Sequence, residues 1–431
     1  MDFARKVSQV LLNKYLSLFL EFFSSTLIAT NLGVFDYGRY TVLFLIPSLI
    51  GSYASFGLGP SIIYHINKKN TEMGAIFFSY GLIGLITGSF FSVFLIFISK
   101  NILLESFYNY DINLKQIVIS SIIIPLIILQ KYFKAIVRAQ YKILSFSVIM
   151  DFLPSVIRII GIIYIFKIIE GGLQELIYLP IILNIIITST LATKIFIEIL
   201  RFKKKNKIFL SINEVASIYN FGLKSFLGSF IQKANDQLIT IFAVPLLDME
   251  MMGIFSLGYK FTTLLTSFTA SISVVYVPKV SKTDINNIKS LITQIIPQLI
   301  SLLLLIVLLS YIFLPFIVNL FYGNQYISSF WIFAILSPGL IALAITRISN
   351  TSFTQSGRPF IKSISRSIGI IVNISIMFFL IKQLSVYGLA LSISISYFFM
   401  MFISLIYLNK IFAINPTKLF KFDFFILKKS L

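Results

Sequence analysis

Charged side chains interrupt several segments of this chain that are otherwise apolar enough to cross a lipid bilayer. The stretch YNFGLKSFLGSFIQKANDQLITIF at 219–242 carries Lys224, Lys233 and Asp236 among aromatic, aliphatic and small residues. Seven charges of this kind fall inside apolar segments: Glu21, Asp151, Arg158, Lys224, Lys233, Asp236 and Lys260. A cation at the bilayer centre costs roughly 2.5–3.5 kcal/mol, so four facing lipid would cost on the order of 10 kcal/mol, comparable with a protein's net stability. We therefore expect these side chains to face protein, an opposite charge or water.

These charges are compatible with neutral pairing and with anion binding. Lys233 and Asp236 are i, i+3 neighbours on one helix face and could neutralise each other. Asp151 and Arg158 also share a face, two turns apart, and Glu21 could pair with a cation on a neighbouring helix. Even if every acid takes one cation, one cation is left over, and surplus positive charge in a hydrated cavity suits a phosphate, a carboxylate or an acidic sugar. The substrate-binding candidates are Arg158, Lys224, Lys233 and Lys260.

The sequence lacks the residues and motifs that metal binding, nucleotide binding or cysteine chemistry would require. The absence of cysteine excludes disulfides, thiolate metal sites and cysteine nucleophiles. The sequence has no HExxH, no GxxxxGK[ST], no DxDxDG and no Gly-rich nucleotide loop, so we expect no metal, no cofactor and no use of ATP by this chain. The single histidine, His65, is expected to be a solvated residue at the end of a membrane span.

The amino-acid composition indicates whether the chain folds in water or in a lipid bilayer. Of 431 residues, 57% are hydrophobic and 12% are charged, whereas soluble domains carry about 25% charged residues. This chain is therefore predicted to be an all-α, polytopic integral membrane protein. Its net charge of +20 is explained by the positive-inside rule, without nucleic-acid binding.

Apolar runs of membrane-spanning length predict twelve transmembrane helices. They fall near 15–31, 40–63, 75–99, 113–131, 146–166, 175–196, 217–243, 251–277, 291–314, 327–346, 362–382 and 386–408. With the N-terminus inside, 27 lysines and arginines lie in cytoplasmic segments and five in outside segments. This alternation places both termini in the cytoplasm of a multi-pass plasma membrane protein.

Two six-helix bundles are expected to share one orientation. The predicted divisions are an N-terminal bundle at 1–200, a cytoplasmic basic linker at 201–215, a C-terminal bundle at 216–410 and a basic, aromatic cytoplasmic tail at 411–431. Parallel repeats of this kind place a substrate site between the halves near the midplane.

Glycines also mark one predicted helix contact. Gly81, Gly84 and Gly88 recur at helical spacing in the third span. Small residues at this spacing allow two membrane helices to approach closely, so we expect this face to pack against another helix.

Several stretches resemble a known family. NLGVFDYGRYTVLF at 31–44 resembles the first outside turn of polysaccharide-export flippases, where a Leu-Gly-x-x-x-Tyr-Gly-x-Tyr pattern joins the first two helices. FGLGPSIIYHINKKN, NFGLKSF, ANDQLITIF, MGIFSLGYKF, VYVPKVSK and SFTQSGRPFIKSISRSIGIIVNI follow in the family's order. The chain therefore resembles bacterial lipid-linked oligosaccharide flippases of the O-antigen and capsule type, within the multidrug/oligosaccharidyl-lipid/polysaccharide exporter superfamily.

This resemblance implies a V-shaped, alternating-access transporter that moves a polyprenyl-pyrophosphate-linked repeat unit from the inner to the outer leaflet of the bacterial plasma membrane. Family members carry cations in the central cavity, and Arg158, Lys224, Lys233 and Lys260 match them by helix position. Turnover needs an energy source, for which Glu21, Asp151 and Asp236 are candidates that bind H+ or Na+. The expected partners are the lipid-linked glycan, membrane lipids, and the glycan polymerase and chain-length machinery, with no nucleic acid.

Two other classes remain open. A cation-coupled drug antiporter of the same superfamily would favour an acidic, aromatic-lined cavity, and the four cations against three acids argue against it. A membrane enzyme of the glycan pathway would need a large outside loop with catalytic groups, and the predicted outside loops are short. The chain is therefore expected to be a transporter and not an enzyme.

Overall fold

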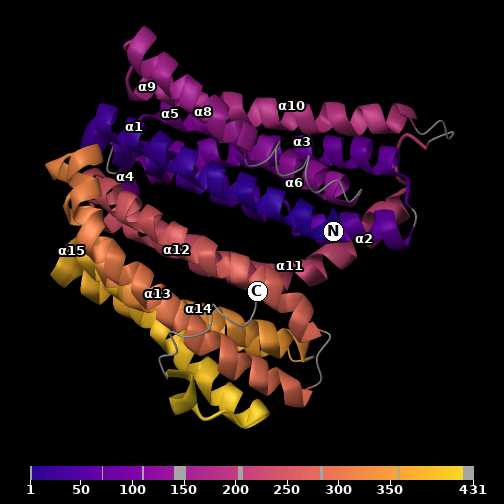
Figure 1. Cartoon of the computed structure of the whole chain (residues 1–431). Helices are drawn as coiled ribbons and strands as arrows, with labels where there is room; N and C mark the ends of the chain where they lie inside the picture. Colours follow the sequence, from indigo (N-terminus) through magenta and orange to yellow (C-terminus); the bar gives the residue numbers. More distant parts are fainter. Residues whose placement is uncertain are drawn as a thin grey trace. The chain divides into compact units, whose positions relative to one another are not determined.

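A computed structural model of the chain describes residues 2–69, 71–108, 111–139, 152–201, 207–281, 285–356, 358 and 360–420. In these segments the regular structure is helical throughout, as the composition predicts. The chain divides into two compact units, which we call the N-terminal unit (Met1–Phe230) and the C-terminal unit (Ile231–Leu431). The coloured ribbon in Figure 1 runs from indigo to magenta along the first unit and on to yellow along the second.

The N-terminal unit consists of one very long helix and a series of shorter ones. They are α1 (Asp2–Tyr53), α2 (Leu58–Lys68), α3 (Met73–Ile98), α4 (Leu104–Ser106), α5 (Leu114–Ser121), α6 (Ile123–Ala139), α8 (Leu153–Ile163), α9 (Leu173–Leu176), α10 (Tyr178–Arg201) and the first part of α11 (Ile212–Ala243). Single π-helical turns follow α3 and α8, at Ser99–Leu103 and Tyr164–Ile168. Helix α6 packs against α3, α10, α1 and α2, so it lies at the centre of this unit (Figure 1).

The C-terminal unit has fewer and longer helices. After the end of α11 come α12 (Met249–Ser281), α13 (Ile285–Tyr322), α14 (Ser328–Gln355) and α15 (Phe360–Phe412), with short 3₁₀ turns at Val244–Leu246, Asn324–Tyr326 and Pro416–Phe420. Helix α14 packs against α12, α13 and α15 and forms the core of this unit.

Two of the described helices are broken by one non-helical residue each. In α1 the break is at Gly33, with φ 75° and ψ 175°. This region of the backbone map is open to glycine and closed to most other residues, so the NLG sequence explains why the chain turns there. In α15 the break is at Ser385, with φ 52° and ψ −131°.

Seven helical segments in the described residues are long and apolar enough to span a membrane. They are Tyr15–Asn67, Met73–Asn101, Leu114–Ala139, Leu173–Arg201, Ile288–Tyr322, Asn324–Thr354 and Phe360–Phe412. The chain is therefore a multi-pass membrane protein, as predicted. The count of twelve crossings and the division into two six-helix bundles stay predictions.

The glycines of α3 allow close packing against α6. A Cβ atom at Gly88 would lie 2.3 Å from the Pro125 Cα, and one at Gly84 would lie 3.1 Å from the Leu129 Cδ2. At Gly81 the nearest atom, the Phe133 Cζ, would be 3.9 Å away, which is ordinary contact. The predicted helix contact is therefore confirmed, and Gly88 is its closest point.

A network of charged and polar groups holds the start of α11 against the loop between α2 and α3. The Lys207 backbone N–H donates to the Glu72 carboxylate at 2.6 Å, and the Lys207 ammonium donates to the Glu214 carboxylate at 2.8 Å. Ser211 and Glu214 form a reciprocal capping box, in which the Ser211 N–H donates to Glu214 at 2.7 Å. The S-x-x-E pattern at 211–214 thus determines where α11 begins.

The stability of this network is expected to depend on pH. The Lys207 ammonium, together with the Ser211 N–H and hydroxyl, lowers the pKa of the Glu214 carboxyl from 4.5 to about 2. A lowered folded-state pKa stabilises the fold fully above the unfolded value and loses that effect as the pH falls through the folded value. We therefore expect Glu214→Gln to lower the thermal midpoint slightly at pH 7, by an amount that vanishes between pH 4.5 and about 2. Equal midpoints for the two proteins at pH 7 would contradict this.

Candidate substrate-binding residues

Arg158 lies on α8, which begins with Pro154 in its first turn and packs against α1 and α10. Its side chain is half-buried, and its guanidinium is near enough to the Tyr40 hydroxyl of α1 for a Coulombic interaction. A guanidinium offers five donors in a rigid planar fork, which matches the oxygens of a phosphate or carboxylate. Arg158 is therefore a half-buried cation on a helix that packs against two others.

Glu21 lies on α1, on the N-terminal side of the break at Gly33. Its side chain is half-buried and shares a helix face with Ser17, Ser24 and Ser25, which are 2%, 1% and 2% exposed. The three hydroxyls donate to carbonyl oxygens of their own helix, one turn back. Glu21 therefore belongs to a polar stripe on the packed face of α1, which is where a coupling acid would have to lie.

Lys260 belongs to the C-terminal unit, on α12, and its side chain is half-buried. The Thr263 hydroxyl donates to its carbonyl oxygen at 2.7 Å. Lys260 also has a further interaction in the structure.

The other four predicted residues are only partly placed. Lys224, Lys233 and Asp236 lie in the helical backbone of α11, while their side chains are outside the described part of the chain. Asp151 lies outside the described residues altogether. The Lys233–Asp236 pairing and the Asp151–Arg158 relation therefore stay predictions.

The contacts of one arginine were missed by sequence reasoning. Arg347, placed directly after the tenth predicted span, lies within α14, which continues to Gln355, and is half-buried. Its Nη1 donates to the Thr266 carbonyl oxygen and to the Thr269 Oγ1, each at 3.0 Å. The buried positions Ile348 and Phe353 continue the apolar pattern beyond the predicted end of the span and could have revealed this extension.

The structure gives Lys131 a contact that the sequence did not indicate, and it corrects the expectation for His65. Lys131, at the end of the fourth predicted span, lies within α6 and donates its ammonium to the Ser52 carbonyl oxygen at 2.6 Å. His65, expected to be solvated, is 3% exposed. Both residues face a neighbouring helix, a property that hydropathy along the chain does not report.

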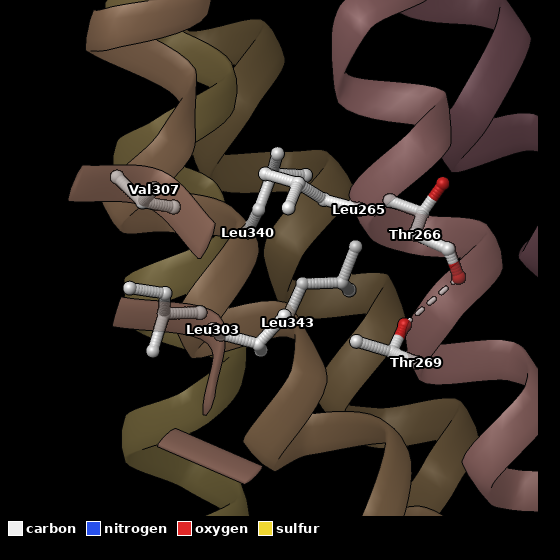
Figure 2. A pocket seen from close by; sticks show the side chains of 8 residues that line it. Leu265, Thr266, Thr269, Leu303, Val307, Leu340 and Leu343 are labelled. Carbon is white, nitrogen blue, oxygen red and sulfur yellow. Dashed lines mark hydrogen bonds between the residues drawn. The ribbon is translucent and has the colours of Figure 1, made fainter. Parts of the chain in front are cut away.

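A crevice beside Arg347 lies between α12, α13 and α14 (Figure 2). Six of its eight lining residues are aliphatic, and the other two are Thr266 and Thr269, joined by the hydrogen bond drawn in Figure 2 at 2.9 Å. The crevice is too narrow for a water molecule. It cannot host a hydrated anion, and the hydrogen bonds of Arg347 to Thr266 and Thr269 beside it tie α14 to α12.

Comparisons with known proteins identify the fold. The sequence profile of a family described as "Polysaccharide biosynthesis protein" matches residues 27–331. The structure is similar to lipid II flippase MurJ in an inward closed conformation, with a TM-score of 0.72 and 18% identity over 95% of this chain and 88% of that chain. It is also similar to an inward-facing multidrug resistance MATE family transporter of the MOP superfamily, with a TM-score of 0.72 and 14% identity over 90% and 93% of the two chains.

A third similar structure is that of a MOP superfamily transporter from Pyrococcus furiosus Vc1, with a TM-score of 0.62 and 12% identity over 95% of each chain. The binding pocket of that transporter is described as having reverse polarity, which suggests a different function for it. No curated protein sequence matches this chain. At these identities the structural matches show the fold alone: that of MOP superfamily transporters.

Proposed function

Because this chain belongs to the polysaccharide biosynthesis protein family, we propose that it flips a polyprenyl-pyrophosphate-linked oligosaccharide from the cytoplasmic to the outer leaflet of the bacterial plasma membrane. The glycan would serve O-antigen, capsule or related surface polysaccharide assembly. The observation that carries the proposal is Arg158, a half-buried guanidinium between the helices of a membrane protein. A permanent cation in such a place is costly unless an anion or water meets it, and a pyrophosphate supplies that anion.

The proposed architecture has twelve crossings in two six-helix bundles with alternating access. Tyr15–Asn67 and Phe360–Phe412 each contain 53 residues. A straight helix of that length would extend roughly 80 Å, whereas the hydrocarbon core is about 30 Å thick. The breaks at Gly33 and Ser385 therefore support two crossings in each segment.

The proposed site consists of Arg158, Lys224, Lys233 and Lys260, which would contact the pyrophosphate or acidic sugars. Phosphate groups favour such charge-assisted hydrogen bonds. Glu21, Asp151 and Asp236 would bind H+ or Na+ during the return step. Glu21 supports this role by its position on the polar face of α1.

The second candidate function is cation-coupled drug antiport. The likeness to a multidrug resistance MATE family transporter, at a TM-score of 0.72, favours it. The cation at Arg158 argues against it, because cationic drugs would be repelled. The flippase proposal accounts for this charge and the antiporter proposal does not.

The test is reconstitution. The purified full-length protein is placed in vesicles with a fluorescent saccharide on a short polyprenyl diphosphate, and a membrane-impermeant reagent reports which leaflet the saccharide occupies. We expect protein-dependent transfer of the saccharide lipid and none of a phosphatidylcholine analogue. Equal transfer of both lipids would indicate an unspecific leak. Transport of cationic dyes in exchange for H+ or Na+, without saccharide transfer, would establish the antiporter function instead.

A further inference from the structure

A groove whose lining includes none of the proposed transport residues lies within the N-terminal unit, between the end of α2 and the start of α11. Its volume is about 490 Å³, within the usual range of ligand pockets. It is lined by Tyr64, His65, Lys69, Asn213, Ala216, Ser217, Asn220 and Phe221. The groove is larger than a simple ion requires, so its size fits the headgroup of an organic ligand.

At the floor of the groove, His65, Ser217 and Lys69 form a chain of hydrogen bonds in which the donor and the acceptor of each bond can be assigned. The His65 Nδ1 lies 2.9 Å from the Ser61 carbonyl oxygen, which can only accept, so Nδ1 carries a proton. The His65 Nε2 lies 3.2 Å from the Ser217 Oγ, and the Lys69 ammonium donates to the same Oγ at 3.1 Å. In the neutral ring, Ser217 therefore donates to His65 and accepts from Lys69. One N–H of Lys69 is used in this chain and two remain to meet a ligand.

The walls of the groove, α2 and the start of α11, are held in place by contacts within the protein. The Ser61 hydroxyl donates to the Ile218 carbonyl oxygen at 2.7 Å, which joins α2 to α11. The Tyr64 and Phe221 rings, which both line the groove, stack on each other with centroids 4.6 Å apart and an interplanar angle of 11°. The network around Lys207 and Glu214 fixes the first turn of α11. Little ordering remains for a ligand to impose, which favours binding.

The lining selects for negative charge. It contains one lysine, two exposed asparagine amides and no carboxylate among its eight residues. The nearest acid along α11, Glu214, is already engaged by Lys207 and Ser211. An ammonium and two amide groups together suit an oxyanion with several acceptors, and phosphate has that chemistry.

The position of the groove indicates a ligand that is anchored in the membrane. Lys69 lies two residues beyond the membrane-capable segment Tyr15–Asn67. Tyrosine and lysine at the end of a span lie at headgroup depth. The half-exposed rings of Tyr64 and Phe221 offer an apolar rim beside the charge. We infer that this groove binds the phosphate-bearing headgroup of a lipid, with Lys69 as its ionic contact.

The experiment measures lipid binding to the full-length protein in neutral detergent by native mass spectrometry. The probes are a short-chain phosphatidylglycerol, a short prenyl diphosphate, the uncharged short-chain diacylglycerol, and inorganic phosphate. We expect Lys69→Gln to weaken binding of at least one phosphate lipid by about tenfold or more, since one charge-assisted hydrogen bond is lost. Lys69→Arg should retain most of the binding, because the charge remains.

The matched control is Lys289→Gln, which removes another exposed lysine, one that the predicted topology also assigns to the cytoplasmic side. It should leave binding unchanged. A second variant, Asn220→Leu, changes the α11 wall of the groove and leaves the charge of Lys69 in place. It should also weaken lipid binding, and it replaces Lys69→Gln as the test if that variant does not fold.

The probes also identify the source of the phosphate. Loss confined to phosphatidylglycerol assigns the site to a bilayer phospholipid, and loss confined to the prenyl diphosphate assigns it to the lipid carrier of a glycan. Diacylglycerol binding as tightly as phosphatidylglycerol, binding of inorganic phosphate alone, or equal binding by wild type, Lys69→Gln and Asn220→Leu would overturn the inference. The measurement reports binding only, so a failure of the proposed transport activity would not affect it.

Discussion

Gly88→Ala is expected to abolish most of the folded protein, although it adds only one methyl group. The new Cβ would lie 2.3 Å from the Pro125 Cα and 2.5 Å from the Pro125 Cβ. These atoms belong to a rigid ring and its backbone, so they cannot move aside as a flexible side chain would. Overpacking a core costs about 1–3 kcal/mol and occasionally more, and here the two helices α3 and α6 would have to separate.

The control for this substitution lies on the same helix. Gly81→Ala meets only ordinary contact, with the Phe133 Cζ at 3.9 Å, and alanine favours a helix over glycine by about 1 kcal/mol. We expect Gly81→Ala to keep or raise the thermal midpoint in detergent, while Gly88→Ala lowers it sharply together with the amount of protein in the membrane. Equal midpoints for both variants would mean that α3 and α6 are further apart than the structure shows.

Arg158→Gln is expected to reduce saccharide transfer by more than about tenfold while the protein stays folded in the membrane. If Arg158 contacts the pyrophosphate, its loss removes a charge-assisted, bidentate contact worth roughly 1.5–3 kcal/mol. Glutamine keeps a polar side chain with an amide donor, but it is shorter and has no charge. Arg158→Lys should retain part of the activity, since the charge remains and the planar fork is lost.

Two measurements separate this role from a structural one. Saccharide transfer is recorded with the thermal midpoint for wild type, Arg158→Gln, Arg158→Lys and the control Lys167→Gln. Lys167 is an exposed cation nine residues further along the chain, in the π-helical turn after α8. Normal transfer by Arg158→Gln would remove Arg158 from the substrate site. A fall of the midpoint in parallel with transfer would assign it to packing against α1.

Some features of the fold could be predicted from the sequence, and others could not. The apolar runs and the scarcity of charge predicted helices and a membrane, because hydropathy is a property of consecutive residues. The S-x-x-E box at 211–214 is also a local signal of a helix start, although the predicted span began only at 217. Gly33, in the quoted stretch NLGVFDYG, lies where a predicted turn joins the first two helices, and the structure places a break there.

The ends of the helices were harder to predict, because a helix ends where its packing against other helices ends and not where the hydropathy falls. Arg347 and Lys131 look like loop cations in the sequence, yet each lies within a helix and donates to a carbonyl oxygen of a neighbouring helix. The break in α15 falls at Ser385, between the predicted spans 362–382 and 386–408, so hydropathy indicated the turn. Serine has no special tendency towards positive φ, so the sequence did not indicate which residue takes that conformation.

The sequence by itself determined that this protein is helical, spans a membrane and carries charges where lipid cannot meet them. Only the tertiary structure decided what those charges contact. The Arg158 guanidinium lies near Tyr40 of another helix, and His65 meets Ser217 across 152 positions of the chain. The reason is that hydropathy and helix propensity arise from neighbours along the chain, whereas a groove and its hydrogen bonds require two distant helices to fix their rotation and separation by packing.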